Sequence, residues 1–541
     1  MKFKSDQTYD KLRGGYYTPA PVAVFLTRWA LGAGASSLLE PSCGDGAFLD
    51  AALKYSKPPR VIHGVELDPA EAAKAQARLG RPSADRRIFP MDYLKFGDVA
   101  PRGAYEAVVG NPPYIRYQFL ASETQGLAKM LYERHGLPFT KHLNAWAPFV
   151  VDSLDRLVPG GRQAMIIPAE LMNVIHSGGL RRFLLEQCSK VLVIDPQTLI
   201  FNGSLQGTVL LLAEKRRRGE NHPCGLAITH EVDNNFLVAD PETVFRSALF
   251  VDREPSDDKW MDSLLTVEER DVLGRITRLP DVHEFRDIAH VEVGIVTGAN
   301  KFFLVSDSTV CEYDLQEFAR PMFGRSFHCQ GVIYDEGLHA ENGAAGLATN
   351  FLQFGAVPFN ELPSGARRYV EKGEAEDTHQ RYKCRIREPW YDVPSIRSSK
   401  LSLLKRCHEL PRVISNELGA LTTDTAYRVD SNFPSSSIAV SFVNSLTALS
   451  AELRGRSYGG GVLELVPSEI RSLLVPLVEA SAQDLSNLNA RLHGGESVEA
   501  ILESQDNRVL SSVGLTSDEI GTIQAARMRL RNRRLREVEA A

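Results

Sequence analysis

The chain has little that would place it in a membrane or outside the cell. No apolar run among its 541 residues reaches the roughly 18 residues that a membrane span requires. The first residues lack the apolar core of a secretion signal. Seven cysteines are scattered without a C-x-x-C pair, which argues against a disulfide framework or a zinc site. We therefore expect a cytoplasmic protein that needs no membrane and no metal.

An excess of positive charge is also missing. The formal net charge is -6 and the pI is about 6.2, which counts mildly against a nucleic-acid-binding protein. Net charge averages over all faces, however, so a basic cleft can coexist with it. Hydrophobic residues make up 43% and charged residues 24% of the chain, the composition of a globular protein. The length predicts about two to four domains.

Short apolar runs alternate with helical periodicity between residues 36 and 214. Strands are predicted at 36–41, 60–67, 86–92, 105–111, 161–170, 190–195 and 208–214, and helices at 69–79 and 144–158. This alternation predicts an α/β fold with a doubly wound, mostly parallel sheet of seven strands. Only a loop separates the last two strands, which predicts an antiparallel hairpin at one edge of the sheet.

A change of pattern divides the chain. The charged segment EKRRRGENHPCG (214–225) and the polar stretch DREPSDDKW (252–260) interrupt the alternation. We place the boundary near residue 250, with one domain over 1–250 and a second, α+β domain over 251–541. The last predicted helix begins at about Ser517 and is rich in arginine. For this helix, solvation or packing is favoured over a contact with nucleic acid.

A glycine-containing turn follows the first predicted strand. Gly44 and Gly46 lie in LLEPSCGDGAFL, where glycine permits close approach of a ligand to the backbone. Glu66 ends the second strand about twenty residues later. In nucleotide-binding α/β proteins an acid at this position accepts hydrogen bonds from the ribose hydroxyls. Asp92 ends the third strand. Three strand ends on one edge of an α/β sheet predict a site for a nucleoside cofactor.

The charge of this turn indicates which nucleoside. NAD requires a third glycine and a neutral or positive loop for its pyrophosphate, but Leu49 stands at the third position. Glu40 and Asp45 make the loop acidic, which disfavours a pyrophosphate and an NAD-dependent oxidoreductase. S-adenosylmethionine carries a sulfonium, an ammonium and a ribose but no phosphate, and it suits the turn better.

The fourth strand ends in VVGNPPYIRY. The two prolines fix two φ angles and push Asn111 out of the helical region. The Asn111 side-chain oxygen and the Pro112 carbonyl can accept the hydrogens of an exocyclic amine and turn its nitrogen toward sp³ geometry. Rigid acceptors of this kind are what electrostatic catalysis requires. Tyr114 can stack on the planar group, so the motif predicts methylation of a conjugated amine.

Together these motifs resemble the gamma-class N6-adenine DNA methyltransferases of bacterial restriction–modification systems. The resemblance covers about residues 1–220 and begins with GGYYTPAPVAVFL (14–26). It implies methyl transfer from S-adenosylmethionine to an adenine that is rotated out of the duplex and held between Tyr114 and Phe201. The implied catalytic residues are Asn111, Pro112, Tyr114 and Phe201. The implied cofactor-binding residues are Thr18, Glu40, Ser42, Gly44, Gly46, Glu66, Leu67, Asp92, Tyr93, Pro113 and Phe149.

The second domain is too large for an accessory flap. Its segments 290–305 and 456–476 resemble, more loosely, parts of the target-recognition domains of the same family. We therefore expect it to bind double-stranded DNA. Arginine and lysine on loops are typical phosphate contacts, and the candidates are Lys301, Arg325, Arg367, Arg368, Arg397, Lys400, Lys405, Arg406, Arg454 and Arg456.

The sequence contains no convincing nuclease motif. We expect a stand-alone, monomeric methyltransferase, with any cognate endonuclease encoded separately. Two alternatives remain open: an amino-methyltransferase acting on RNA or protein glutamine, and a non-catalytic DNA-docking subunit with the same fold. The intact Asn111, Tyr114 and Glu66 argue against the docking subunit, and the long C-terminal part argues against a glutamine enzyme, which usually ends soon after the sheet.

Overall fold

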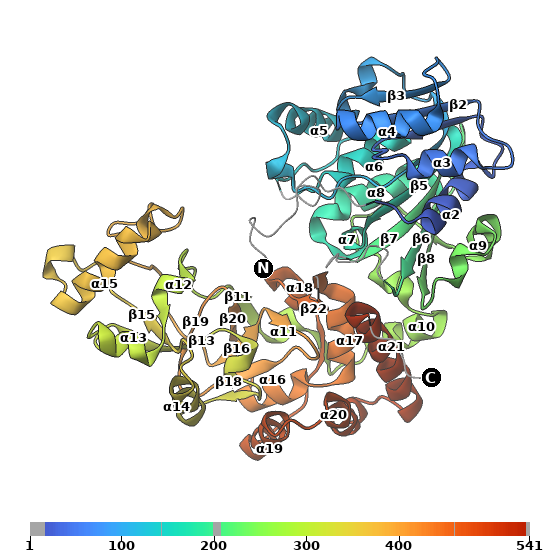
Figure 1. Cartoon of the computed structure of the whole chain (residues 1–541). Coiled ribbons are helices and arrows are strands. Elements are labelled where there is room, and N and C mark those ends of the chain that lie inside the picture. Colours follow the sequence, from blue (N-terminus) through green and yellow to red (C-terminus); the bar gives the residue numbers. More distant parts are fainter. Residues whose placement is uncertain (1–16, 142, 199–206, 459, 537–541) are drawn as a thin grey trace. The chain divides into compact units, whose positions relative to one another are not determined.

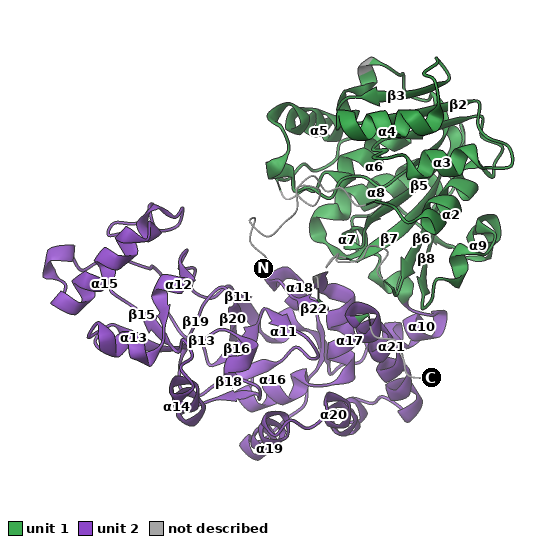
Figure 2. Ribbon diagram, in the orientation of Figure 1, with its two compact units in different colours: residues 1–264, 458–460, 536–541 green, residues 265–457, 461–535 purple. Residues whose placement is uncertain are grey.

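The computed structural model describes residues 17–141, 143–198, 207–458 and 460–536. The chain forms two compact units (Figure 2). Unit 1 comprises Met1–Leu264, Tyr458–Gly460 and Arg536–Ala541, and unit 2 comprises Leu265–Ser457 and Gly461–Leu535. The division near Leu264 lies beyond residue 250 because strand β9 (Val251–Arg253) pairs with the sheet of unit 1.

In the described part of unit 1, one sheet has nine strands in the order β3-β2-β1-β4-β5-β7-β6-β8-β9 (Figure 1). The other strands are β1 (Ser37–Glu40), β2 (Val61–Glu66), β3 (Arg86–Pro90), β4 (Tyr105–Gly110), β5 (Leu157–Pro168), β6 (Cys188–Pro196), β7 (Thr208–Lys215) and β8 (Cys224–Glu231). Strand β7 runs antiparallel to both neighbours and β9 antiparallel to β8, whereas the remaining pairs are parallel. The predicted α/β class and mostly parallel sheet are confirmed.

The seven predicted strands are all present, but the predicted edge is wrong. Strands β6 and β7 do form an antiparallel hairpin. They lie inside the sheet, because β8 pairs with β6 in parallel and β9 pairs with β8. The apolar run CGLAITHE follows a charged segment that resembles the end of a domain, so the sequence pattern hid these two strands.

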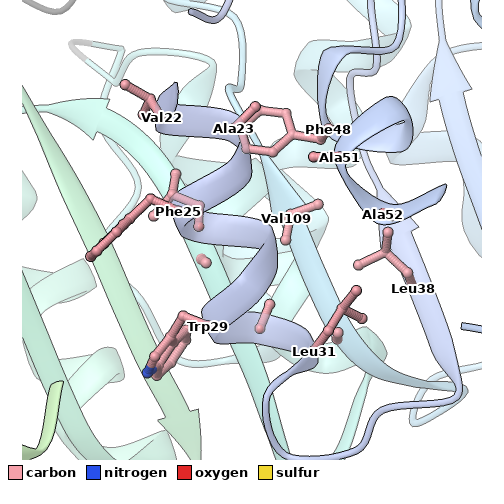
Figure 3. Close-up of a cluster of buried hydrophobic side chains, with 14 of the residues drawn as sticks. Val22, Ala23, Phe25, Trp29, Leu31, Leu38, Phe48, Ala51, Ala52 and Val109 are labelled. Atoms are coloured by element: carbon pink, nitrogen blue, oxygen red, sulfur yellow. The ribbon is translucent and has the colours of Figure 1, made fainter. Parts of the chain in front are cut away.

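Helices cover both faces of this sheet. They are α2 (Ala20–Leu31), α3 (Ala47–Leu53), α4 (Pro69–Leu79), α5 (Ser122–Arg134), α6 (Trp146–Arg156), α7 (Glu170–Asn173), α8 (Gly178–Gln187) and α9 (Pro241–Ser247). Helices α2, α3, α4 and α9 share one buried cluster with the sheet. Figure 3 shows Phe25 and Trp29 of α2 with Phe48 of α3 in this cluster. Helices α5 and α8 pack on α6, which contacts β4 and β5.

Helix α4 shows why local signals located some elements well. The Asp68 carboxylate accepts hydrogen bonds from the amides of Ala70 at 2.8 Å and Glu71 at 3.2 Å. Pro69 occupies the first helical position, and Gly80 follows the last one. An acidic cap, an initial proline and a terminal glycine are standard helix boundaries, and the observed bounds match the predicted range of 69–79.

Unit 2 mixes small sheets with helices. Its described strands form sheets in the orders β11-β20-β16-β18-β14, β12-β15-β13-β19, β17-β22-β21 and β10-β23. The strands are β10 (Val282–Glu284), β11 (His290–Glu292), β12 (Leu304–Val305), β13 (Ala319–Phe323), β14 (Ile333–Tyr334), β15 (Asn350–Leu352), β16 (Leu401–Leu404), β17 (Arg406–Cys407), β18 (Val413–Asn416), β19 (Leu421–Thr422), β20 (Ala426–Asp430), β21 (Arg456–Tyr458), β22 (Val462–Glu464) and β23 (Leu474–Pro476).

The helices of unit 2 are distributed along its whole length. They are α10 (Val267–Ile276), α11 (Phe285–Ile288), α12 (Asn300–Phe303), α13 (Asp307–Glu312), α14 (Glu336–Ala344), α15 (Ser364–Ala375), α16 (Ser435–Phe442), α17 (Ser445–Arg454), α18 (Pro467–Ile470), α19 (Ala482–His493), α20 (Val498–Ser512) and α21 (Ser517–Leu535). The predicted α+β character of this part of the chain is confirmed.

The arginine-rich helix α21 packs inside unit 2. Arg534 is buried and pairs with Glu452 of α17 at 2.8 Å. Arg531 pairs with Glu409 at 2.8 Å, and Arg529 with Glu269 at 2.5 Å. A buried guanidinium requires such a partner. These arginines therefore hold unit 2 together, as expected for a packed helix.

Candidate active site

The carboxyl ends of four parallel strands bring the motifs of unit 1 to one edge of the sheet. Strands β1, β2 and β4 end at Glu40, Glu66 and Gly110, and β3 ends two residues before Asp92. Their pairing is parallel throughout. This is the edge at which open α/β sheets bind ligands. The helices that follow the strands begin on the same side, so backbone amides also point toward this edge.

Glu66 holds the glycine turn in place. Its two carboxylate oxygens accept hydrogen bonds from different backbone amides, that of Gly44 and that of Asp68, each at 2.8 Å. Gly44 and Gly46 have φ angles of 50° and 91°, which other residues rarely adopt. Each carboxylate oxygen keeps a second lone pair. The predicted ribose acceptor can therefore fix the turn and accept ligand hydroxyls together.

Glu40 is the buried carboxylate of the site. Its residue is 2% exposed, and its Oε2 has no hydrogen-bond partner among the described residues. Burial, followed by the charges of Glu66 and Asp45, holds the pKa of the Glu40 carboxyl well above its ordinary value. Such a group favours a cationic ligand that replaces the missing solvation. The sulfonium and ammonium of S-adenosylmethionine fit this requirement, and a pyrophosphate does not.

Arg78 is a site residue that sequence reasoning missed. Its guanidinium pairs with the Asp45 carboxylate at 2.6 Å. A Cβ at Gly46 would lie 3.2 Å from the Arg78 side chain and 3.3 Å from the Ala75 backbone, so the turn passes tightly over helix α4. Arg78 offsets the Asp45 charge and leaves Glu40 as the buried acid of the turn. The two residues are far apart in the sequence, so no local pattern predicts that they pair.

A short chain of hydrogen bonds joins the glycine turn to the Asn-Pro-Pro-Tyr segment. The Ser42 hydroxyl donates to the Asn111 backbone carbonyl at 3.1 Å. The Asn111 side-chain amide donates to the Thr18 hydroxyl at 3.5 Å, the long limit for a hydrogen bond. Thr18 precedes helix α2 and is predicted to contact the cofactor. In the structure it also contacts Asn111. Three segments distant in sequence therefore meet at Asn111.

Tyr114 is anchored at its phenol. The Tyr114 hydroxyl donates to the Ile166 carbonyl of strand β5 at 3.0 Å, and the ring packs against the core of unit 1. Pro112 is buried and Pro113 is half-buried. Two prolines and an anchored ring leave the segment little conformational freedom. Its acceptors are accordingly held before any substrate arrives.

Asp92 and Tyr93 occupy the turn after β3. Asp92 accepts a hydrogen bond from the Leu94 amide at 3.0 Å and another from the Thr124 hydroxyl of α5. The Tyr93 ring is 4.9 Å from that of Phe149 on α6, and both side chains are buried. Thr124 is a second residue that the sequence did not indicate. The rings of Tyr93 and Phe149 form one aromatic wall, and their contact with a cofactor stays a prediction.

Leu67 and Phe201 complete the predicted set. Leu67 is 71% exposed beside Glu66 at the strand-end edge. An exposed leucine there offers apolar surface to a bound ring. Phe201 lies outside the described residues, so its contact with a target base stays a prediction.

Nine of the ten predicted phosphate contacts of unit 2 fall into two groups, and the tenth, Arg454, is exposed in the last turn of helix α17. Arg397 pairs with Glu292 and Asp430, Lys405 and Arg406 pair with Glu464, and Arg456 pairs with Glu469. Lys301, Arg325, Arg367, Arg368 and Lys400 are exposed, and the described structure gives them no ion pair. The second group is better suited to phosphates, because its members need not exchange an acidic partner.

The described residues show neither a cluster of metal ligands nor a membrane-spanning helix. No group of three or more His, Cys, Asp or Glu side chains there is arranged to hold a metal ion. No helix of that part of the chain combines the length and the apolar character that crossing a membrane would require.

Two family models match different parts of the chain. The model described as Eco57I restriction-modification methylase matches residues 67–201, which include Asp92, Asn111 and Phe149. The model described as type II methyltransferase M.Eco57I, C-terminal domain, matches residues 257–510. The first match lies in unit 1 and the second almost entirely in unit 2.

Curated relatives align along most of the chain. Type II methyltransferase M.AccI from Acinetobacter calcoaceticus is 22% identical over 475 residues, covering 84% of this chain and 84% of the relative. Type II methyltransferase M.XamI from Xanthomonas campestris pv. amaranthicola is 22% identical over 474 residues, covering 86% and 85%. The solved structure of the type IIG restriction endonuclease BpuSI is 13% identical, with a TM-score of 0.45 over 96% of this chain and 66% of that one.

Proposed function

We propose that this chain, which belongs to the restriction–modification methyltransferases, is a site-specific adenine N6-methyltransferase of duplex DNA that uses S-adenosylmethionine. The relatives are named type II methyltransferases, which supports DNA as the substrate. Methylation of an exocyclic amine is supported by the Asn-Pro-Pro-Tyr segment, whose acceptors match such a group, and adenine is the base that the resemblance to the gamma-class enzymes implies.

The main support for the proposal is one hydrogen bond within the site. The hydrogen bond from Ser42 to the Asn111 carbonyl ties the glycine turn to the amine-binding segment. A cofactor held by the turn and an amine held by Asn111 would therefore be neighbours. Such proximity supplies much of the rate of a two-substrate transfer, since it removes the entropy of bringing the reactants together.

The chain's own groups suffice for the amine side of the reaction. The Asn111 side-chain oxygen and the Pro112 carbonyl accept the two amine hydrogens and draw the nitrogen lone pair out of conjugation. Because these acceptors are fixed beforehand, little reorganisation is needed in the transition state. Tyr114 stacks on the base, held in orientation by its bond to Ile166. No strong base is required, because the proton becomes acidic once the nitrogen is methylated.

The cofactor side uses the turn and the aromatic wall. When bound, S-adenosylmethionine supplies an electrophilic methyl group. Glu40 favours its cationic end, with Thr18, Ser42, Gly44 and Gly46 around the methionine. Glu66 would accept hydrogen bonds from the ribose, and Asp92 would accept one from the adenine amino group. Leu67, Tyr93, Pro113 and Phe149 are the residues that would hold the adenine end.

The second part of the chain reads the DNA in this proposal. Residues 251–541, most of them in unit 2, form the target-recognition domain, and the target adenine rotates out of the duplex to lie between Tyr114 and Phe201. The enzyme is the modification half of a restriction–modification system, acts as a monomer and works beside a separately encoded endonuclease. Methyl transfer by these groups needs no metal.

The test uses cofactor labelled in its methyl group. The full-length protein is incubated separately with duplex DNA, RNA and a mixture of proteins, and label is counted in each. We expect label in duplex DNA. Label found only in RNA or protein would contradict the proposal, and no transfer at all would favour the non-catalytic docking subunit. Asn111→Ala should abolish transfer and leave cofactor binding within about threefold of wild type, because Asn111 acts on the amine. An active Asn111→Ala variant would overturn its assigned role.

A further inference from the structure

Unit 2 contains a cavity of about 420 Å³ that is distant in sequence from every residue of the candidate active site. It is lined by Gly294, Ile295, Val296, Lys383, Ile386, Arg387, Pro394, Ser395 and Arg428. Three of these side chains are cationic and none is acidic. The volume lies within the range of small-ligand sites.

Arg428, on strand β20, is the unusual member of this lining. Its residue is 8% exposed, yet its Nε and Nη1 atoms have no hydrogen-bond partner among the described residues. Only Nη2 reaches an acid, Glu292, at 3.3 Å. Glu292 is shared, since Arg397 contacts it at 2.5 Å and His290 at 3.3 Å. Arg428 is therefore a buried cation whose charge and donors are only partly matched, which is unfavourable unless a ligand completes it.

The walls of the cavity are fixed in advance. Arg387 donates to the carbonyls of Val296 at 2.7 Å and Thr297 at 2.8 Å. The backbone of Ile295 is hydrogen-bonded to the end of β19 and the residues after it: its amide donates to the Thr422 carbonyl at 2.8 Å, and its carbonyl accepts from the Asp424 amide at 3.1 Å. A site with such fixed walls loses little entropy when a ligand binds.

From this geometry we propose that the cavity binds a phosphate group of the DNA backbone, with Arg428 as its donor and Lys383 at its rim. A recessed donor can meet only a group that protrudes from its ligand. On a duplex the phosphates protrude, whereas the base edges lie on the floors of the grooves. A guanidinium is also the side chain best matched to phosphate oxygens. The inference rests on the proposed function, because it takes DNA as the ligand.

The assignment predicts a contact that positions DNA without reading its sequence. Losing one phosphate contact should weaken binding to all duplexes alike and lower the slope of log K against log salt by about one. Methylation should still occur at the same sequence, because phosphate contacts carry no base information.

Ser395 provides a matched pair of variants for the test. It lines the cavity, is exposed and has a φ angle of 60°, a region that Asn and Asp enter more readily than other residues. Ser395→Asp and Ser395→Asn should therefore both fold, and they differ by one charge at the cavity. Gln483→Glu, on the exposed face of α19, adds the same charge away from the lining residues.

Equilibrium binding of the full-length variants to two unrelated duplexes is measured from 50 to 200 mM salt. We expect Ser395→Asp to bind both duplexes about three- to tenfold more weakly than Ser395→Asn, with a slope lower by about one. Gln483→Glu should keep the wild-type slope. Equal binding by the two Ser395 variants overturns the site. A changed set of methylated sequences also overturns it, because the cavity would then read bases. Binding of inorganic phosphate that differs between the two variants, with no difference in DNA binding, overturns it as well, because the cavity would then be a site for a free anion.

These outcomes separate the cavity from the proposed function. A wild-type protein that binds no duplex DNA contradicts both. A wild-type protein that binds DNA and methylates adenine, together with indistinguishable Ser395 variants, contradicts the cavity alone.

Discussion

Replacing Glu66 by glutamine tests whether one carboxylate both fixes the glycine turn and binds the cofactor. In the structure each oxygen of Glu66 accepts a different backbone N–H, from Gly44 and from Asp68, both at 2.8 Å. Glutamine has the same shape but only one acceptor oxygen. Its NH₂ group must therefore face one of the two backbone amides, which places two hydrogen-bond donors opposite each other. One backbone N–H loses its partner whichever way the amide turns.

The magnitude follows from these two bonds. An unsatisfied backbone N–H costs about 1–3 kcal/mol, and the surviving bond loses the strength that the carboxylate charge gave it, about 1 kcal/mol. Unit 1 should therefore be destabilised by about 2–4 kcal/mol. Hydrogen bonds from ligand hydroxyls weaken in the same way, by about 2 kcal/mol for two bonds. That loss corresponds to roughly 30-fold weaker cofactor binding.

Both quantities can be measured on the full-length protein. Calorimetric titration with S-adenosylmethionine gives the affinity, and denaturant unfolding gives the stability. Glu254→Gln, an exposed change beyond strand β9, controls for the loss of one negative charge from unit 1. Glu66 does not have this double role if Glu66→Gln binds the cofactor within about threefold of wild type, or if its cofactor affinity falls no more than that of Glu254→Gln.

Two further predictions concern Glu40 and Tyr114. Because the pKa of Glu40 is raised, its carboxyl keeps a proton in the free protein over a wider pH range than an ordinary glutamate does, and a bound cation favours release of that proton. Cofactor affinity should therefore rise with pH up to the raised pKa. The contribution of Glu40 to the stability of the free protein has the opposite pH dependence. It is present at low pH and is lost as the pH rises through the raised pKa. Titrations in buffers of different ionisation enthalpy should show the proton release, and Glu40→Gln should abolish it; equal release from that variant would contradict the assignment. Tyr114→Phe removes the hydrogen bond to Ile166, worth about 1 kcal/mol, so single-turnover methyl transfer should slow by up to about fivefold at unchanged cofactor affinity. A rate equal to wild type would show that the anchor is dispensable.

Much of unit 1 could be predicted from local sequence signals. Helix α4 was located to the residue because Asp68, Pro69 and Gly80 are strong local punctuation. The strand ends that carry Glu40, Glu66 and Asn111 follow from short buried runs, and parallel pairing then places them at one edge. Strands β8 and β9 were missed because a charged segment precedes them, and pairing with β6 is decided by long-range contacts.

The contacts inside the site could not be predicted in the same way. Asp45 with Arg78, Asn111 with Thr18 and Asp92 with Thr124 join residues far apart in sequence. No periodicity or spacing encodes such pairs, because they depend on how helices pack on the sheet. The sequence could not indicate Arg428 of unit 2 for the same reason. Only the structure shows that its Nε and Nη1 atoms are buried without a hydrogen-bond partner among the described residues.

The identity of the methylated nucleoside tests the central claim most directly. Duplex DNA is methylated by the wild-type protein with labelled S-adenosylmethionine, digested to nucleosides and separated by chromatography with mass detection. The account predicts that the label lies in N6-methyladenine and that Asn111→Ala yields none. Label in a methylated cytosine would contradict it, because the Asn111 and Pro112 acceptors would then have been assigned to the wrong base.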